Sequence, residues 1–244
     1  MNRFSAFAIH LGISLVIFII IGYLILFHWY PDYFFASDGG WQGIRIVAFV
    51  DLVLGPVLTL VVFNTAKPKK ELRRDLTIIG TIQAVCLTAG VWVVFTERPI
   101  AMVYADGLFT SETLDDFAKA GHPNPDLSRF RTASGPVHVS VVLPDDPIER
   151  SNVLQSALNQ GTLLRNSPPH LEKFSFEHLN LDDAMPYHQL QARDLEVPFL
   201  STFLSTNGGS VEDYWYFRFG TRYGLNLLAV RKEDKQMLSL KLPE

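Results

Sequence analysis

Residues 39–56 read GGWQGIRIVAFVDLVLGP, and this stretch decides the fold because it sets two opposite charges in a strongly apolar run. Arg45 and Asp51 stand among Ile, Val, Leu, Phe and Ala residues, in a segment apolar enough to cross a membrane. An ionisable group at such depth is energetically costly, so it usually marks function or a contact between helices. The stretch therefore predicts a membrane helix with a polar role.

Three segments are long and apolar enough to be transmembrane helices, at residues 4–30, 44–63 and 76–95. Residues 4–30 contain no Asp, Glu, Lys or Arg and exceed the roughly 20 apolar residues that a helix needs to span hydrocarbon. This apolar core is too long for a signal peptide, and no small-residue cleavage pattern follows it. We therefore expect a retained first helix and a transmembrane domain over residues 1–96.

The connections between the spans predict the orientation of the chain. Residues 67–75 hold five Lys or Arg and two acidic residues, and positive residues near span ends tend to stay in the cytoplasm. Residues 31–43 hold two Asp, no Lys or Arg, and four aromatic residues that suit the opposite membrane interface. The N-terminus is then cytoplasmic and residues 97–244 are exported. In a bacterium, this describes a multi-pass inner-membrane protein with a periplasmic domain.

The exported part, residues 97–244, has the length of one domain and can bury a hydrophobic core. It holds 14 basic and 20 acidic residues, a formal charge of −6, whereas nucleic-acid binding normally needs a basic face. The only cysteine, Cys86, lies in the third span, so the domain forms no internal disulfide. We expect no nucleic-acid partner and a domain that packing alone stabilises.

Several runs of the exported domain have the composition of strands, and one of them alternates strongly. The predicted strands are residues 100–104, 137–143, 214–219, 225–231 and 237–242. A polar turn at residues 232–235 joins the last two into an antiparallel hairpin. The predicted fold class is α+β: a three-helix transmembrane bundle followed by a mixed α/β periplasmic domain with a C-terminal antiparallel hairpin.

Three helices are predicted between these strands. One covers residues 111–120, where Ser111 can cap its start, and another covers residues 186–195. A third begins at Pro147 and ends near Gly161, because proline is tolerated in a first helical turn and glycine favours a helix end. Its apolar residues are expected to form a buried stripe: Ile148, Val153, Leu154 and Leu158.

The two charges of the second span are expected to have separate partners. They are six residues apart, about 240° around an ideal helix and about 9 Å along it. Arg45 lies near the outer end and can extend to the lipid headgroups, whereas Asp51 lies about two turns deeper. Matched depths of antiparallel spans place Asp51 near Thr88 of the third span. His10 and Gln83 are expected to form a second polar contact with Thr59.

Gly55 and Pro56 follow this charge and predict a kink in the second helix. The proline frees the carbonyl of Leu52, and the kink would open a groove. Two interpretations stay open for the polar residues and the kink. They form a docking site for the membrane helix of a partner, or they only hold three helices together, as interhelical hydrogen bonds commonly do.

Signals for catalysis are weak. Seven histidines are scattered along the chain without the spacing of metal ligands, and neighbouring acidic pairs usually only solvate loops. The sequence has no P-loop, no GxSxG motif and no Rossmann fingerprint. We expect no enzyme activity, no catalytic or metal-binding residues and no cofactor.

Several motifs together resemble a known family. GWQGIRIV at residues 40–47 is continued by VDLVLGP at 50–56 and LTL at 58–60. The pair FN at 63–64 leads to LRRDL at 72–76, and RPIA follows at 98–101. This set is similar to the membrane signature of bacterial type IV pilin accessory proteins. Beyond about Tyr104 the resemblance is one of architecture and length, with a looser similarity in residues 137–144 and in the terminal hairpin.

The resemblance implies a protein of the bacterial inner membrane that assists a cognate major type IV pilin in stability, assembly or surface display. It implies no catalytic residues. Arg45 would then meet an acidic group near the outer end of a pilin helix, and the Gly55-Pro56 kink would receive its apolar face. Two alternatives are a membrane-anchored periplasmic sensor of a small molecule, and a structural scaffold that binds pilus assembly-platform proteins. The lipid bilayer is a partner in each case.

Overall fold

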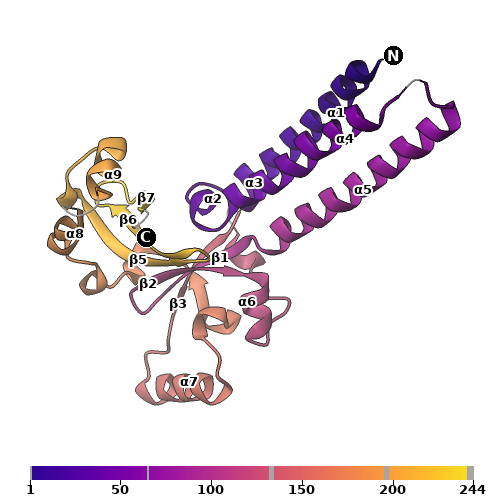
Figure 1. Ribbon diagram of the computed structural model, residues 1–244. Helices are drawn as coiled ribbons and strands as arrows, with labels where there is room; N and C mark the ends of the chain where they lie inside the picture. Colours follow the sequence, from indigo (N-terminus) through magenta and orange to yellow (C-terminus); the bar gives the residue numbers. More distant parts are fainter. Residues whose placement is uncertain (1, 65, 132–134, 195–197, 241–244) are drawn as a thin grey trace. The chain divides into compact units, whose positions relative to one another are not determined.

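The computed structural model describes residues 2–64, 66–131, 135–194 and 198–240, apart from the side chains of residues 192–194. It divides into two compact units, Met1–Arg98 and Pro99–Glu244, which are described separately. The first unit is helical, and the second combines a sheet with helices (Figure 1).

Three helices of the first unit are long and apolar enough to cross a membrane, namely Arg3–Trp29, Gly40–Val62 and Lys69–Thr96. The first consists of α1 (Arg3–Leu24) and a π-helical segment, Ile25–Trp29. The second runs through α3 (Gly40–Ala48), a π-helical segment (Phe49–Leu54) and α4 (Gly55–Val62). The third is α5 (Lys69–Thr96), and a short helix, α2 (Phe34–Ser37), lies between the first two. The three predicted spans are therefore confirmed as helices.

Two of these helices begin earlier than the sequence predicted. Most of the basic stretch at residues 67–75 is not a loop, because α5 begins at Lys69, directly after Pro68. Lys, Arg and Glu are good helix formers, so this stretch can extend the apolar helix by almost two turns. The second helix begins at Gly40 and not at Ile44. Gly39, with φ 107°, makes the left-handed turn that this early start requires.

Two glycines allow α5 and the second helix to pack closely against each other. A Cβ atom at Gly43 would lie 2.9 Å from Val94 Cγ1, and one at Gly90 would lie 3.1 Å from Ile46 Cγ2. Small residues let membrane helices approach closely where no hydrophobic effect drives association. The hydroxyl of Tyr30 also donates a hydrogen bond of 2.9 Å to the carbonyl of Val94. These contacts fix the register between the first, second and third helices.

A seven-stranded sheet organises the second unit, in the order β4-β3-β1-β2-β5-β6-β7. The pairs β1–β3 and β2–β5 are parallel and the other neighbours are antiparallel. The strands are β1 (Pro99–Ala105), β2 (Leu108–Thr113), β3 (Val137–Val141), β4 (Leu171–Lys173), β5 (Tyr214–Thr221), β6 (Gly224–Arg231) and β7 (Met237–Leu240). The predicted C-terminal hairpin is confirmed as β6–β7, and its last two predicted residues lie outside the described residues.

Two predictions for the helices of this unit are wrong. Ser111 does not cap a helix, because it lies in β2, which pairs with both β1 and β5. The helix α6 (Leu114–Lys119) begins after Thr113, whose side chain forms a capping box with Asp116. The helix α7 (Pro147–Gln160) has the predicted ends, with Gly161 at φ 64°, but none of its residues is buried. Of the expected stripe of α7, Val153 is half-buried, and Ile148, Leu154 and Leu158 are exposed, at 72%, 41% and 81% accessible.

The remaining helices of the second unit are short. They are α8 (Tyr187–Asp194), α9 (Leu200–Asn207) and the 3-10 turns Ser128–Phe130, Leu164–Asn166, Pro168–His170, Phe176–His178, Leu181–Asp183 and Val211–Asp213. Helix α8 confirms the predicted helix at residues 186–195, whose last residue lies outside the described residues.

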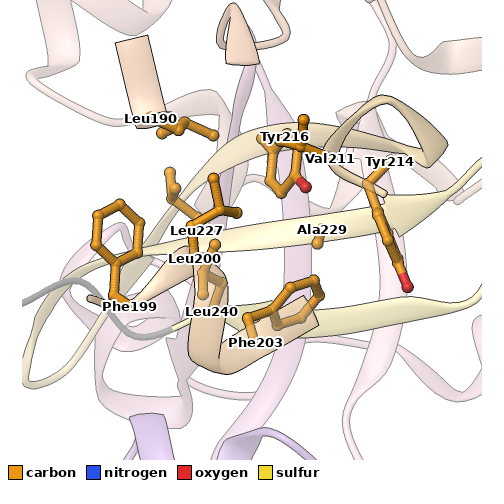
Figure 2. Close-up of a cluster of buried hydrophobic side chains, with 10 residues drawn as sticks. All are labelled: Leu190, Phe199, Leu200, Phe203, Val211, Tyr214, Tyr216, Leu227, Ala229 and Leu240. Carbon is orange, nitrogen blue, oxygen red and sulfur yellow. The ribbon is translucent and has the colours of Figure 1, made fainter. Parts of the chain in front are cut away.

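Two hydrophobic clusters stabilise this unit. In the first, α8 and α9 pack on β5, β6 and β7, and Figure 2 shows the side chains pointing toward one another: Leu190, Phe199, Leu200, Phe203, Val211, Tyr214, Tyr216, Leu227, Ala229 and Leu240. In the second, Phe117 of α6 and Phe130 cover the alternating small side chains of β1 and β3: Ala101, Val103, Val137 and Val139. Every second side chain of a strand points into its cluster, because successive side chains of a strand point to opposite faces of the sheet.

Candidate functional site

A buried carboxylate lies in the helical unit, at the π-helical segment of the second helix. Asp51 is fully inaccessible, and its Oδ1 accepts hydrogen bonds from Ser14 Oγ (3.0 Å) and Gln83 Nε2 (2.7 Å). Its Oδ2 is buried and has no hydrogen-bond partner among the described residues. Since Ser14 belongs to α1 and Gln83 to α5, this one side chain joins all three long helices.

The local backbone explains why Asp51 points inward. The segment Phe49–Leu54 is π-helical, a form that is rare and frequent at functional sites. Pro56 has no N–H to donate to the preceding turn, so a regular α-helical ladder cannot run through this position. The irregularity lies where the sequence predicted a kink. However, Gly55 and Pro56 are buried between the helices, so they do not border an open groove as expected.

Gly55 makes room for the third member of the cluster. A Cβ atom at this position would overlap the carboxamide of Gln83, which lies directly against the glycine backbone. The Oε1 of Gln83 is buried without a hydrogen-bond partner in the described chain. The amide orientation follows from its bond to Asp51, since a carboxylate oxygen accepts only from the NH₂ group. Gly55 therefore leaves the space that the carboxamide of Gln83 occupies in its contact with Asp51.

The second predicted polar contact is present in part. His10 Nδ1 and Thr59 Oγ1 are 2.6 Å apart, and Thr59 is buried. Gln83, the third expected member, bonds to Asp51 instead. His10 lies one helical turn from Ser14 on the same face of α1. The two contacts thus form one line of polar side chains inside the bundle.

Thr88 is not the partner of Asp51, although its predicted depth was close. Gly43 meets Val94 and Gly55 meets Gln83, so Asp51 is level with residues near 87 of α5. Thr88 lies five residues after Gln83, which is about 140° around the helix, so it faces away from the bundle. The long side chain of Gln83 reaches Asp51 from one turn away. Counting residues along the spans predicted the depth of Asp51 relative to α5. The rotation of α5 about its axis determines that Gln83, and not Thr88, faces Asp51.

Arg45 is exposed near one end of the second helix. Its guanidinium carbon lies 4.9 Å from the centre of the Trp41 ring, a cation–π contact. Among the described residues it has no acidic partner. The separate environments predicted for Arg45 and Asp51 match this arrangement, and the role of Arg45 toward a partner stays a prediction.

A shallow groove of about 740 Å³ runs along the outer face of α5. Small side chains at helical spacing form most of it, with one tryptophan at the end: Thr77, Gly80, Thr81, Ala84, Val85, Thr88, Ala89 and Trp92. In the most apolar stretch of α5, 11% of the residues are buried, whereas the corresponding shares in the first and second long helices are 22% and 28%. The third helix thus has the smallest buried share of the three.

The second unit contains a buried polar cluster that the sequence did not indicate. Glu112, 5% accessible in β2, accepts a hydrogen bond of 2.7 Å from Asn166 Nδ2 and forms an ion pair of 3.0 Å with Arg165 Nε. Burial raises the pKa of Glu112, while the bonds from Asn166 and Thr110 and the charge of Arg165 act in the opposite direction. This cluster attaches the segment that follows α7 to the sheet.

Neither unit shows a metal-binding group of three His, Cys, Asp or Glu residues within the described ranges. His178 is satisfied by structural contacts, since its Nδ1 lies 2.6 Å from Ser140 Oγ and accepts from the backbone N–H of Ser175. Ser140 is fully buried, so this pair cannot present a nucleophile to a substrate.

Comparison with known proteins gives similarity to fimbrial assembly proteins of Dichelobacter nodosus. Those of serogroups C1 and C2, serogroup E1 and serogroup I are each 30% identical to this chain over 96 residues, 39% of its length. The aligned part covers 73% of the protein from serogroups C1 and C2. The chain belongs to this family of fimbrial assembly proteins. The expected relationship to a pilus-related family is therefore confirmed.

The aligned part covers 37% of the fimbrial assembly proteins of serogroups E1 and I, so this chain matches little more than a third of their length. No family model matches the chain, and no solved structure matches it.

Ser14 is the residue of the polar cluster that sequence reasoning missed. The sequence contains a signal for it, because Ser14 is a hydroxyl residue in an apolar span, four positions after His10. Residues four apart share one helix face, so one neighbouring helix can supply a partner to both His10 and Ser14. Thr59 and Asp51, eight residues apart on the second helix, satisfy this condition.

Proposed function

We propose that this member of the fimbrial assembly family is an inner-membrane accessory protein. It assists a cognate type IV major pilin in stability, assembly or surface display and catalyses no reaction. The observation that carries the proposal is the relationship to fimbrial assembly proteins. Three helices long and apolar enough to span a membrane support it, as does the basic N-terminal end of α5, which favours a cytoplasmic N-terminus and a periplasmic second unit.

The groove on α5 is the proposed docking face for the membrane helix of the pilin. Small residues let two helix backbones approach closely within lipid, and threonine hydroxyls can add interhelical hydrogen bonds. The groove residues extend from Thr77 to Trp92, about 22 Å along the helix and thus most of the hydrocarbon thickness. A helix of similar length is the partner that can cover such a strip.

The buried cluster around Asp51 has a supporting role in this proposal. It fixes α5 on the other two helices, so the outer face of α5 keeps a defined shape. Arg45, exposed at the outer end of the second helix, is available to an acidic group of the pilin. These roles replace the docking groove expected beside Gly55 and Pro56.

Site-specific photo-crosslinking in native cells tests the docking face. A photoreactive amino acid replaces Ala84 in the groove, and a control replaces Ile19, which is 59% exposed on α1. The expected result is a crosslink to the major pilin from position 84 and a much weaker one from position 19, with products identified by mass spectrometry. Capture of assembly-platform proteins without pilin would favour the scaffold alternative. Equal capture of pilin from both positions would refute docking on α5.

Filling the groove provides a second test. Ala84→Leu adds bulk to the groove, whereas Cys86→Leu adds bulk to an exposed position of α5 that does not line it. We expect Ala84→Leu to reduce pilin recovery in a membrane pull-down and Cys86→Leu to leave it unchanged, at equal amounts of the accessory protein. Unchanged recovery with Ala84→Leu would count against the proposal.

A further inference from the structure

A second concave site lies in the sheet unit, between helix α7 and the sheet. It is a cavity of about 370 Å³, within the range of small-molecule sites. Most of its wall is apolar and comes from three parts of the unit: Leu108, Val141, Leu143, Leu154, Leu158 and Leu163. Figure 1 shows α7 at the far end of two extended connections. The helix thus contributes a wall but no buried residue.

The strand register explains why apolar surface remains open here. Leu108 pairs with Ala105 on one side and with Arg218 on the other, so these three side chains share one face of the sheet. The same face carries Val103, whose neighbourhood is covered by α6. Helix α6 covers this face only as far as Val103. The apolar side chains of Ala105 and Leu108 therefore lie beyond the hydrophobic cluster and line the cavity.

One end of the cavity is held in place by the buried polar cluster. Glu112 lies on the same face of β2 as Leu108, four residues along the strand. Its contacts to Arg165 and Asn166 hold the segment that returns from α7, and Arg165 lines the cavity. The wall formed by this segment is therefore fixed.

The charges at the rim define what the cavity can bind. Arg218 is exposed and, within the described part of the chain, has neither an ion pair nor a side-chain hydrogen bond. Arg165 already pairs with Glu112, and the acidic Asp106 lies in the turn between β1 and β2. A guanidinium that can still form an ion pair, next to an apolar cavity, favours a ligand with an anionic head and an apolar tail.

We propose that this cavity binds an aliphatic monocarboxylate. Its carboxylate pairs with Arg218, and its chain lies on Leu108 and Val141 beneath Leu154 and Leu158 of α7. The ligand buries leucine side chains that are otherwise exposed, and so it joins α7 to the sheet. This site is independent of pilin docking, and it supplies the concave apolar pocket that a sensor of small molecules requires.

Photoaffinity labelling of the full chain in lipid nanodiscs tests the site. The probe is an octanoate analogue with a diazirine on its chain, and mass spectrometry locates the labelled residues. We expect labelling on α7 and on residues 162–165, with competition by octanoate and weak competition by octanol, which has the same chain without the charge. Arg218→Ala should reduce labelling about tenfold, the effect of losing a hydrogen bond to a charged group. Arg218→Lys should retain most of it.

Two controls make the result decisive. Arg131→Ala removes an exposed arginine that does not line the cavity and should leave labelling unchanged. Ala157→Trp fills the cavity from α7 and should abolish labelling while Arg218 remains in place. Labelling that survives both Arg218→Ala and Ala157→Trp would overturn the proposal, and so would equal competition by octanol and octanoate. Absence of labelling on the cavity residues would also overturn it.

Discussion

The substitution Gly55→Ala tests the packing of the polar cluster directly, because it adds one carbon atom where the structure has no room for it. The new Cβ would overlap the carboxamide of Gln83, so this side chain must shift, and we expect the shift to break its hydrogen bond to Asp51. Asp51 would then keep the hydroxyl of Ser14 as its one donor among the described residues. A buried carboxylate that loses a donor is destabilised, so the bundle should lose stability.

The size of this effect follows from a comparison with Gly12→Ala. Gly12 lies on α1, and a Cβ atom there would meet nothing within 4 Å. Alanine is a better helix former than glycine by about 1 kcal/mol, and this gain is common to both variants. The difference between them therefore reports the displaced carboxamide. A buried polar group that loses its partner costs about 1–3 kcal/mol, and interhelical bonds within membranes reach about 1.7 kcal/mol. We expect Gly55→Ala to be less stable than Gly12→Ala by about 1–2 kcal/mol.

The assay is unfolding of the full chain by SDS in mixed micelles, followed by tryptophan fluorescence. A Trp215→Phe background limits the signal to the three tryptophans of the helical unit. The same pair of variants is then measured with Gln83→Ala, which removes the overlapping carboxamide. In that background Gly55→Ala should behave like Gly12→Ala. If Gly55→Ala costs as much without Gln83 as with it, the proposed link between Gly55, Gln83 and Asp51 is refuted.

Four further substitutions have defined outcomes. Ser14→Ala should lower the stability of the helical unit by about 0.5–1.5 kcal/mol in the same SDS titration, since Asp51 would keep Gln83 alone. Thr59→Val should cost a similar amount because His10 loses its buried partner, whereas Thr88→Val, on the exposed face of α5, should change stability by less than about 0.5 kcal/mol. For Glu112, the raised pKa means that the folded state holds the proton more tightly than the unfolded state. Its contribution to stability is therefore fully present below the ordinary pKa of 4.5 and is lost as pH rises through the raised value. In Glu112→Gln, the melting temperature should consequently depend less on pH above pH 4.5 than it does in the unchanged protein. An unchanged pH profile in that variant would mean that Glu112 ionises as freely in the fold as outside it.

The sequence predicted most reliably those features that depend on local chemistry. The three long helices follow from hydrocarbon thickness, which any span must match whatever surrounds it. The ends of α7 follow from Pro147 and Gly161, because proline suits a first helical turn and glycine adopts the left-handed conformation that ends a helix. The burial of that helix could not be predicted in the same way. An apolar stripe shows only that a surface can be covered, and in α7 the sheet does not reach it.

Features that depend on distant partners were missed for the same reason. Residues 108–113 include Ser111, Glu112 and Thr113, a polar run that resembles a helix start. They form a strand because β1 and β5 provide hydrogen-bond partners on both sides. The choice of Gln83 over Thr88 depends on the rotation of α5 about its axis, which hydropathy does not determine. In both cases the deciding contact joins residues that are far apart in the chain.

The order of strands in the sheet has a consequence for how the second unit folds. Leu108 of β2 pairs with Arg218 of β5, about 110 residues later, and β6 and β7 follow after that. A pairing over such a distance requires closing a long loop, which slows folding. Until β5 arrives, one edge of β2 has unpaired backbone groups that can associate with other chains. During synthesis this edge of β2 therefore stays exposed while about 110 further residues are added, and a partner or chaperone that covers it would raise the yield of folded protein.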